Sequence, residues 1–378
     1  MKQLLIIGGG VAAAESALAA RAQDPESRIV VLSEESVPPY RRPALSGLVG
    51  DAAVDLDKLL LHPAEFYAQR KIALHLNVRV ERIDPERHCA ISSDGRRFDY
   101  DRLIVATGSR ANRPPIPGAE LPVAMAFRSY ADLLELRSRL DSGVRRAAVI
   151  GAGLLGLELA EALLRRNCQV ELLDHQDRLL SRSIDASGSA FLLRRLEQIN
   201  GLKIHLSSRV QAIEPDRVRL ADRDDLPVDL VVFSAGSRPE APVLPGMEDG
   251  KRLPVDNELK TAWPDVFAAG DVAEGPWFNP GLYLPARDMG RAAGTIAMGG
   301  KADCAWGAFP VRLAAFGVKL FAYGAVDEAI GSPAQTTDAD FVREFRRSDG
   351  RLAGVVLIGN VSAAATYQRE IDAAGASR

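Results

Sequence analysis

The chain begins with the stretch Leu4-Leu5-Ile6-Ile7-Gly8-Gly9-Gly10-Val11-Ala12-Ala13, in which a short apolar run leads directly into a glycine-rich turn. The arrangement occurs a second time, as Ala147-Ala148-Val149-Ile150-Gly151-Ala152-Gly153-Leu154-Leu155-Gly156. A pattern rich in alanine and leucine, with the spacing of a helix, follows each turn. Each stretch therefore predicts a buried strand, a tight turn and a helix in succession.

An acidic residue completes each of these two units. The apolar run Ile29–Leu32 is followed by Glu34, and the run Val170–Leu173 is followed by Asp174. A glycine-rich turn between strand and helix, with an acid after the next strand, is the pattern of a dinucleotide-binding unit. Because all these features recur together, we expect the chain to hold two dinucleotides and to move electrons between them. The alternative for Asp174 is a simple cap at the end of a strand.

The glycines of such a turn have separate physical roles. The first permits a tight turn, the second lets a pyrophosphate approach the backbone, and a small third residue lets helix and strand pack closely. The pyrophosphate then lies at the helix N-terminus, where free amides and the helix dipole favour an anion. The predicted cofactor-binding residues of the two turns are Gly8, Gly10, Val11, Ala12 and Ala13, and Gly151, Gly153, Leu154, Leu155 and Gly156.

The composition excludes several other classes of protein. The chain has 378 residues, of which 47% are hydrophobic, enough for two or three domains with sizeable cores. A net charge of −3 without a charged block argues against nucleic acid as a partner. We find no signal peptide and no membrane-spanning run, so we expect a cytoplasmic protein without membrane contact. The three cysteines and five histidines are too scattered to ligate a metal ion.

A further internal repeat indicates how the domains are arranged. The stretch Leu103–Arg110 resembles Leu230–Arg238, since each is an apolar strand followed by Gly-Ser-Arg and then by prolines. Each closes one glycine-turn unit, so we expect the second unit to be inserted into the first. The predicted α/β fold has two Rossmann-like dinucleotide-binding domains and a small C-terminal α+β domain. Their predicted bounds are 1–112 with 239–300 for the first domain, 113–238 for the second, and 301–378 for the third.

The C-terminal region has a different pattern from the rest of the chain. Short apolar runs predict a small antiparallel sheet, and a closing helix is expected near Ala363–Ala373. The runs are Phe309–Leu313, Lys319–Tyr323, Phe341–Phe345 and Leu352–Ile358. We expect the aromatic residues of this region to belong to its core rather than to cover a cofactor; they include Trp306, Phe316, Phe321 and Tyr323.

Together these motifs resemble the pyridine nucleotide-disulfide oxidoreductases, a family of flavoprotein reductases with two dinucleotide-binding domains. The resemblance covers nearly the whole chain. It is nearest to the rubredoxin and ferredoxin reductases and to the flavoprotein part of NADH-dependent nitrite reductases. It implies that the first domain binds FAD and that the second binds NADH or NADPH.

The resemblance also implies which residues form the sites. Tyr40-Arg41-Arg42-Pro43-Ala44-Leu45-Ser46 is similar to a family stretch in which Arg42 would contact FAD. Gly270-Asp271 is similar to the Gly-Asp pair whose carboxylate binds the ribityl chain of FAD. The other residues assigned to FAD are Glu34, Val80, Ala106, Thr107, Gly108, Arg128 and Leu284; Asp174 and Gly236 are assigned to cofactor binding in the second unit. Glu158 matches a glutamate near the flavin–nicotinamide contact and is the predicted catalytic residue, although the nearby Glu161 leaves a simple surface carboxylate as the alternative.

A few positions bear on cofactor preference and on the electron path. Asp174 favours NADH, because a carboxylate accepts a hydrogen bond from the free 2′-hydroxyl and repels a 2′-phosphate; the nearby Arg178 leaves NADPH possible. Lysines that are common in ferredoxin reductases are replaced by Gly47 and Ala314. Family members that work through a thiol need a cysteine where Ser46 and Gly47 stand here. Neither residue can act as a thiolate, so electrons must leave for an external acceptor.

The leading functional hypothesis is therefore an enzyme, monomeric or homodimeric, that transfers hydride from NADH to FAD. Electrons would then pass to a small redox protein of the rubredoxin or ferredoxin type. One alternative is the NADH-oxidising flavoprotein of a nitrite or nitrate reductase system, with an attached reductase component as acceptor. A third hypothesis, of another class, is a non-enzymatic sensor that binds FAD and NAD.

Overall fold

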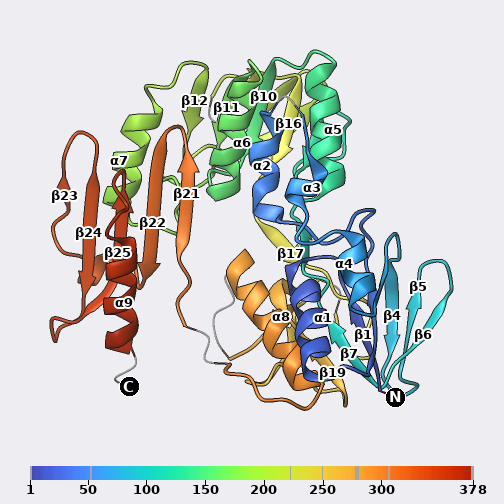
Figure 1. Ribbon diagram of the computed structural model, residues 1–378. Helices are drawn as coiled ribbons and strands as arrows, with labels where there is room; N and C mark the ends of the chain where they lie inside the picture. Colours follow the sequence, from blue (N-terminus) through green and yellow to red (C-terminus); the bar gives the residue numbers. More distant parts are fainter. Residues whose placement is uncertain are drawn as a thin grey trace. The chain divides into compact units, whose positions relative to one another are not determined.

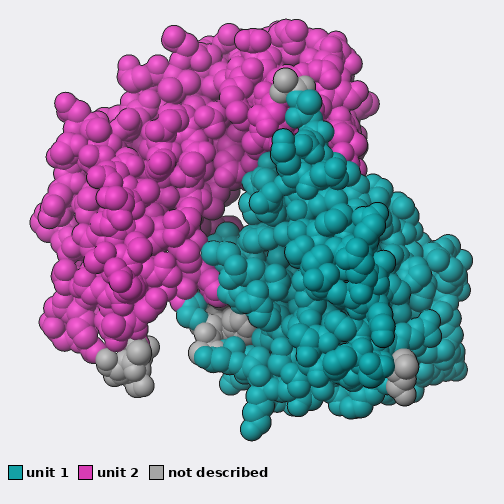
Figure 2. All heavy atoms as spheres, viewed as in Figure 1, with its two compact units in different colours: residues 1–45, 53–110, 237–307 teal, residues 46–52, 111–236, 308–378 magenta. Residues whose placement is uncertain are grey.

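The computed structural model describes residues 2–51, 53–221, 223–248, 250–276, 281–304 and 307–375. The chain divides into two compact units, which are coloured separately in Figure 2. Unit 1 comprises residues 1–45, 53–110 and 237–307, and unit 2 comprises residues 46–52, 111–236 and 308–378. This division by contacts groups the C-terminal segment with the middle of the chain. The division into three domains by cofactor stays a prediction.

A five-stranded parallel sheet forms the core of unit 1, with strand order β19-β7-β1-β2-β3. The strands are β1 (Gln3–Ile7), β2 (Arg28–Leu32), β3 (Ile72–His75), β7 (Arg102–Val105) and β19 (Val266–Ala268). In the central strand β1, Leu4 to Ile7 are all buried. A parallel strand covered on both faces requires such an unbroken apolar run, which explains why the sequence shows no alternation here.

Two helices of unit 1, α1 (Val11–Gln23) and α8 (Tyr283–Ala297), pack side by side (Figure 1). Glycines make this close approach possible. A Cβ atom added to Gly290 would lie 2.3 Å from the carbonyl oxygen of Ala12, and one added to Gly294 would lie 2.2 Å from that of Ser16. The Ser16 hydroxyl also donates a hydrogen bond to the Gly290 carbonyl at 2.9 Å. These contacts fix α1, the helix that starts at the first glycine turn, against α8.

The other elements of unit 1 are short. A three-stranded antiparallel sheet contains β4 (Val80–Asp84), β5 (Cys89–Ser92) and β6 (Arg97–Asp99). The helical segments are η1 (Arg42–Ala44), α3 (Leu56–Leu59), α4 (Ala64–Gln69) and η2 (Gly270–Val272). Two-stranded pairs are formed by β8 (Ser109–Ala111) with β17 (Ser237–Pro239) and by β18 (Leu253–Pro254) with β20 (Ala273–Glu274).

Unit 2 repeats the parallel sheet, in the order β12-β11-β10-β16-β9. The strands are β9 (Ala124–Ala126), β10 (Arg146–Ile150), β11 (Gln169–Leu173), β12 (Leu202–His205) and β16 (Leu230–Phe233). The accompanying helices are α2 (Leu45–Val49), α5 (Tyr130–Asp141), α6 (Leu154–Arg165) and α7 (Ala186–Leu196). A small antiparallel sheet contains β13 (Val210–Glu214), β14 (Arg217–Leu220) and β15 (Leu226–Pro227). Two parallel sheets built on two glycine turns confirm the predicted fold class.

The C-terminal part of unit 2 forms an antiparallel sheet, as the sequence predicts. Its order is β21 (Val311–Ala315), β22 (Val318–Gly324), β25 (Leu352–Ile358), β24 (Phe341–Arg346) and β23 (Gln335–Thr336), with η3 (Glu328–Ile330) and the closing helix α9 (Ala364–Gly375). The first strand begins later than predicted, because the hairpin turn at Phe316 and Gly317, both with positive φ, sets its pairing with β22.

The aromatic residues of this region lie as expected where they are described. Phe321 and Tyr323 are buried, and Phe316 is half-buried; Trp306 lies outside the described residues. No helix in the described ranges is long and apolar enough to cross a membrane. In the same ranges no group of three or more His, Cys, Asp or Glu side chains could hold a metal ion.

Candidate functional site

The first glycine turn joins β1 to α1 in unit 1. Gly8 has a φ of +143°, and a Cβ atom there would lie 2.1 Å from the carbonyl oxygen of Ala106, so no other residue fits. A Cβ atom on Gly10 would meet nothing within 4 Å among the described atoms. Gly10 is the N-cap of α1, and the helix start receives no side-chain cap in the described part of the chain. Open space in front of uncapped amides fits a bound pyrophosphate.

The second glycine turn, between β10 and α6 in unit 2, repeats this arrangement and adds a third glycine in close contact. Gly151 has a φ of +115°, and its Cβ atom would lie 2.3 Å from the carbonyl oxygen of Ser234. Gly156 faces the Gly151 carbonyl so closely that a Cβ atom would lie 1.8 Å from its oxygen. Gly153, the N-cap of α6, again faces open space, with no described atom within 4 Å of an added Cβ. Leu154 and Leu155 begin the helix.

Asp174 follows β11 and braces the second turn. Its carboxylate accepts a hydrogen bond from the Ala152 amide at 2.7 Å and another from the Gln176 amide at 2.9 Å. His175 Nδ1 lies 3.3 Å from the same carboxylate. Asp174 thus caps the end of β11 and also lies beside the second glycine turn. Gly236 lies shortly after β16 in unit 2 and has a φ of +79°.

The predicted FAD acid Glu34 is part of an ion-pair chain in unit 1. Arg79 donates to Glu34 at 2.7 Å and to Glu240 at 2.9 Å, and Val80 begins β4 directly after it. Burial and the charge of Glu240 raise the pKa of Glu34, while Arg79 opposes that shift. Sequence reasoning missed both partners. Glu240 is distant in sequence, and no pattern links it to Glu34.

Arg42 is held by a partner that the sequence motif does not contain. Its guanidinium lies 2.6 Å from a carboxylate oxygen of Glu35, and the Tyr40 hydroxyl donates to the same carboxylate at 2.8 Å. Arg42 also lies over the Tyr40 ring, 5.1 Å from its centroid. Glu35 therefore fixes the orientation of Arg42. Its position next to Glu34 is the only sequence signal that could have pointed to it.

The remaining FAD assignments lie on three other segments of unit 1. Asp271, in η2, accepts a hydrogen bond from the Ser109 hydroxyl at 2.7 Å. The Thr107 hydroxyl, in the turn Ala106-Thr107-Gly108 after β7, is buried with no hydrogen-bond partner in the described residues. Leu284 lies in the first turn of α8, where no described side chain caps the helix. An unpartnered buried hydroxyl and a second uncapped helix start are both consistent with a cofactor in unit 1.

Two further predicted residues, Arg128 and Glu158, also lie in unit 2. The Arg128 amide donates to Asp132 at 2.8 Å, beside the capping box that Ser129 and Asp132 form at the start of α5. Glu158, in α6, accepts a hydrogen bond from the Ser46 hydroxyl at 2.6 Å. Burial raises the pKa of Glu158, and the Ser46 hydrogen bond opposes that shift. Glu158 is half-buried, and its assignment as the catalytic residue stays a prediction.

Comparisons with known proteins agree with this geometry. Residues 2–290 match the family described as pyridine nucleotide-disulphide oxidoreductase. The chain therefore belongs to this family, and it is an oxidoreductase that binds FAD and NAD(P)H. The resemblance stated from the sequence is confirmed, as is the assignment to an enzyme class.

Two curated relatives and one solved structure illustrate the match. The chain is 35% identical over 279 residues to the 5,5′-dehydrodivanillate O-demethylase ferredoxin reductase subunit of a Sphingobium species, over 71% of this chain and 67% of the relative. It is 30% identical over 347 residues to the assimilatory nitrate reductase electron transfer subunit of Bacillus subtilis. That match covers 88% of this chain but only 44% of the relative. The covalent putidaredoxin reductase–putidaredoxin complex superposes with a TM-score of 0.86 at 26% identity, over 98% of this chain and 93% of that chain.

Proposed function

We propose that NADH reduces FAD bound to this protein and that the electrons then pass to an external one-electron carrier of the ferredoxin or rubredoxin type. The observation that carries the proposal is the absence of a usable thiol. All three cysteines are free, and none lies in the segment Leu45-Ser46-Gly47. Ser46 is instead hydrogen-bonded to Glu158. The relatives described as a ferredoxin reductase subunit and as a putidaredoxin complex support a carrier as acceptor.

The residues of the chain bind and orient the two dinucleotides. Bound FAD supplies the capacity to accept hydride and to release electrons singly. The amides at the start of α1 would hold its pyrophosphate, and Glu34, Arg42 and Asp271 would hold its ribose, phosphate and ribityl groups. The amides at the start of α6 would hold the pyrophosphate of the nicotinamide nucleotide. No protein nucleophile is required, because the protein contributes orientation and electrostatics.

The preference for NADH is part of the proposal. Asp174 lies beside the second glycine turn, and hydrogen bonds from two backbone amides keep its carboxylate fixed. A fixed carboxylate accepts from a ribose hydroxyl and repels a phosphate at the same position. The nearby Arg178 makes an ion pair with Asp177. This pair supports the preference for NADH, because the Arg178 guanidinium then has a partner other than a 2′-phosphate.

A second candidate is the NADH-oxidising flavoprotein of a nitrate or nitrite reductase system. One observation favours it. The match to the Bacillus subtilis nitrate reductase electron transfer subunit covers 88% of the chain, whereas the match to the ferredoxin reductase subunit covers 71%. The acceptor would then be a further redox centre rather than a diffusible carrier.

Anaerobic stopped-flow reduction tests the proposal. We expect NADH to bleach the flavin absorbance more than about tenfold faster than NADPH, because a like-charge contact costs several kcal/mol. The variant D174N should narrow this preference, whereas D216N, at an exposed acid of the β13–β14 hairpin in unit 2, should leave it unchanged. Reoxidation by rubredoxins and ferredoxins, compared with nitrite reductase components, distinguishes the two candidates. A protein without bound flavin contradicts the proposal. A reduced flavin that neither a carrier nor a reductase component reoxidises also contradicts it and favours a sensor.

A further inference from the structure

The short segment 46–52, between two parts of unit 1, belongs by its contacts to unit 2. Its first residue, Ser46, is only 3% exposed. The Ser46 hydroxyl donates to the Glu158 carboxylate at 2.6 Å. A buried hydroxyl with a carboxylate partner forms a charge-assisted hydrogen bond, which is shorter and stronger than a neutral one. This bond joins α2 to α6 within unit 2.

Three arginines hold this segment in place. Arg137 of α5 donates to the carbonyl oxygens of Leu48 and Asp51, each at 2.7 Å. Arg165 and Arg166, at the end of α6, donate to the carbonyl oxygens of Gly47 and Val49 at 2.9 Å and 3.3 Å. We call Arg137, Arg165 and Arg166 the arginine clamp. The last carbonyls of a helix have no partner within that helix, so guanidinium donors satisfy groups that α2 leaves unpaired.

Gly50 gives the arginine clamp the space that it needs. A Cβ atom on Gly50 would lie 2.7 Å from Nε of Arg165. A Cβ atom on Gly47 would meet no described atom within 4 Å. Of these two glycines, therefore, only Gly50 packs closely against α6, and a side chain there would displace the Arg165 guanidinium. The clamp and the glycine together fix α2, and hence Ser46, relative to Glu158.

Glu158 lies near the start of α6, the helix that begins at the second glycine turn. Side chains on a helix lean toward its N-terminus, so the Glu158 carboxylate lies toward the end at which the dinucleotide is proposed to bind. Glu161, one turn further along, has another partner. Its carboxylate accepts a hydrogen bond from the backbone amide of Phe316 at 2.9 Å. The two acids of α6 therefore have separate partners, and Ser46 orients only Glu158.

We infer that Ser46, fixed by the arginine clamp, is a positioning residue that orients the Glu158 carboxylate toward the nicotinamide nucleotide bound at the start of α6. The inference rests on the proposed function of unit 2 as the nucleotide-binding unit. A carboxylate accepts hydrogen bonds from the hydroxyl and amide groups of a nicotinamide riboside, and its benefit depends on a fixed orientation. Ser46 thus supplies an orienting donor without adding a cation.

A double-mutant cycle on the FAD-containing protein tests the inference. NAD⁺ is titrated calorimetrically into wild type, S46A, S46T, E158A and the double variant S46A/E158A. We expect S46A to weaken NAD⁺ binding about fivefold, since it removes one charge-assisted hydrogen bond, and S46T to retain the wild-type affinity. In the E158A background S46A should change nothing, because Ser46 acts through Glu158. The control S189A removes another buried serine hydroxyl of unit 2, in α7, and should bind NAD⁺ normally.

The outcomes separate this inference from the proposed function. An S46A protein with wild-type affinity, or an equal loss in the E158A background, overturns the positioning role while the proposed function stands. A wild-type protein that binds no nicotinamide nucleotide contradicts the proposed function itself. If S46A does not fold, R137A replaces it. We expect R137A to weaken NAD⁺ binding about twofold, only when Glu158 is present, and unchanged affinity overturns the inference.

Discussion

At the scale of single residues, the glycines of each turn differ in what requires them. Gly151 is required by the protein itself, because of its positive φ and its closeness to the Ser234 carbonyl. Gly153 has an ordinary φ of −80° and faces open space, so nothing in the described fold requires glycine there. Close approach of a ligand to the backbone is the proposed reason for glycine at this position. The same contrast separates Gly8 from Gly10 in unit 1.

This contrast predicts opposite results for two alanine variants. G151A should lower the free energy of unfolding by more than about 1 kcal/mol, because a Cβ atom is strained at positive φ and clashes with backbone. G153A should unfold like wild type but bind NAD⁺ about tenfold more weakly, because its methyl group occupies the space of the pyrophosphate. Chemical denaturation and calorimetric titration measure the two effects. A G153A protein with normal NAD⁺ affinity contradicts the assignment of this turn.

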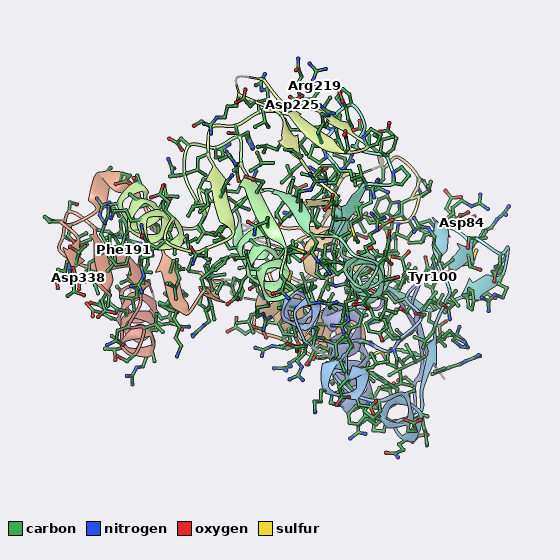
Figure 3. The ribbon with its side chains drawn as sticks, turned by 90° about the horizontal axis from the view of Figure 1, so that it is seen from above. Asp84, Tyr100, Phe191, Arg219, Asp225 and Asp338 are labelled. Carbon is green, nitrogen blue, oxygen red and sulfur yellow. The ribbon has the colours of Figure 1, made fainter. Side chains whose placement is uncertain are left out.

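At the scale of elements, one buried ion pair joins α7 to the C-terminal sheet. Arg343 of β24 lies 2.6 Å from Asp185, the N-cap of α7, and 2.8 Å from Glu328. The Asp185 side chain is 1% exposed. Phe191 of α7, labelled in Figure 3, packs beside this pair on Phe341 with ring centroids 5.6 Å apart. Polar and aromatic contacts together attach the sheet to α7.

The pair predicts a pH-dependent contribution to stability. Burial alone would raise the pKa of Asp185, but hydrogen bonds from Ser187, Arg343 and the Gly188 amide outweigh it and lower the pKa below 3.8. The stabilisation is therefore present above about pH 4 and is lost as the pH falls through the folded-state pKa. D185N, which keeps a good N-cap, should lower the free energy of unfolding by about 3 kcal/mol at pH 7 and by much less near pH 2.

Urea denaturation at the two pH values measures this difference. The control D99N removes an exposed carboxylate that pairs with Arg97, and it should change stability by less than about 0.5 kcal/mol at either pH. If D185N lowers the free energy of unfolding equally at both pH values, the charge of Asp185 contributes nothing to stability. The effect would then come from packing or from the cap alone.

The sequence predicted the elements that local patterns define and missed the contacts that only folding creates. The two parallel sheets follow from apolar runs and glycine turns, which are signals within one short stretch. Ser46 with Glu158, and Arg343 with Asp185, join residues more than a hundred positions apart. Glu35 was missed for a different reason, since its neighbour Glu34 already satisfied the expected pattern. A motif identifies the residue that contacts a ligand more easily than the residue that orients it.

At the scale of the whole molecule, the three cysteines decide between two routes for the electrons. Cys89 and Cys168 are buried and Cys304 is half-buried, all as free thiols. Burial raises the pKa of both Cys168 and Cys304. A thiol kept protonated is a poor nucleophile and a poor redox partner. The proposed route to an external carrier therefore uses none of them.

The triple variant C89A/C168A/C304A tests this on the complete protein. We expect it to retain bound FAD and to reduce a one-electron carrier with NADH at a rate within about twofold of wild type, because no thiol takes part. Loss of the two buried sulfur atoms should lower stability by about 1 kcal/mol at each site. The rate per bound flavin, rather than per protein, separates this loss of stability from chemistry. A triple variant that keeps its flavin, is reduced by NADH and no longer reduces the carrier would show that a cysteine lies on the electron path.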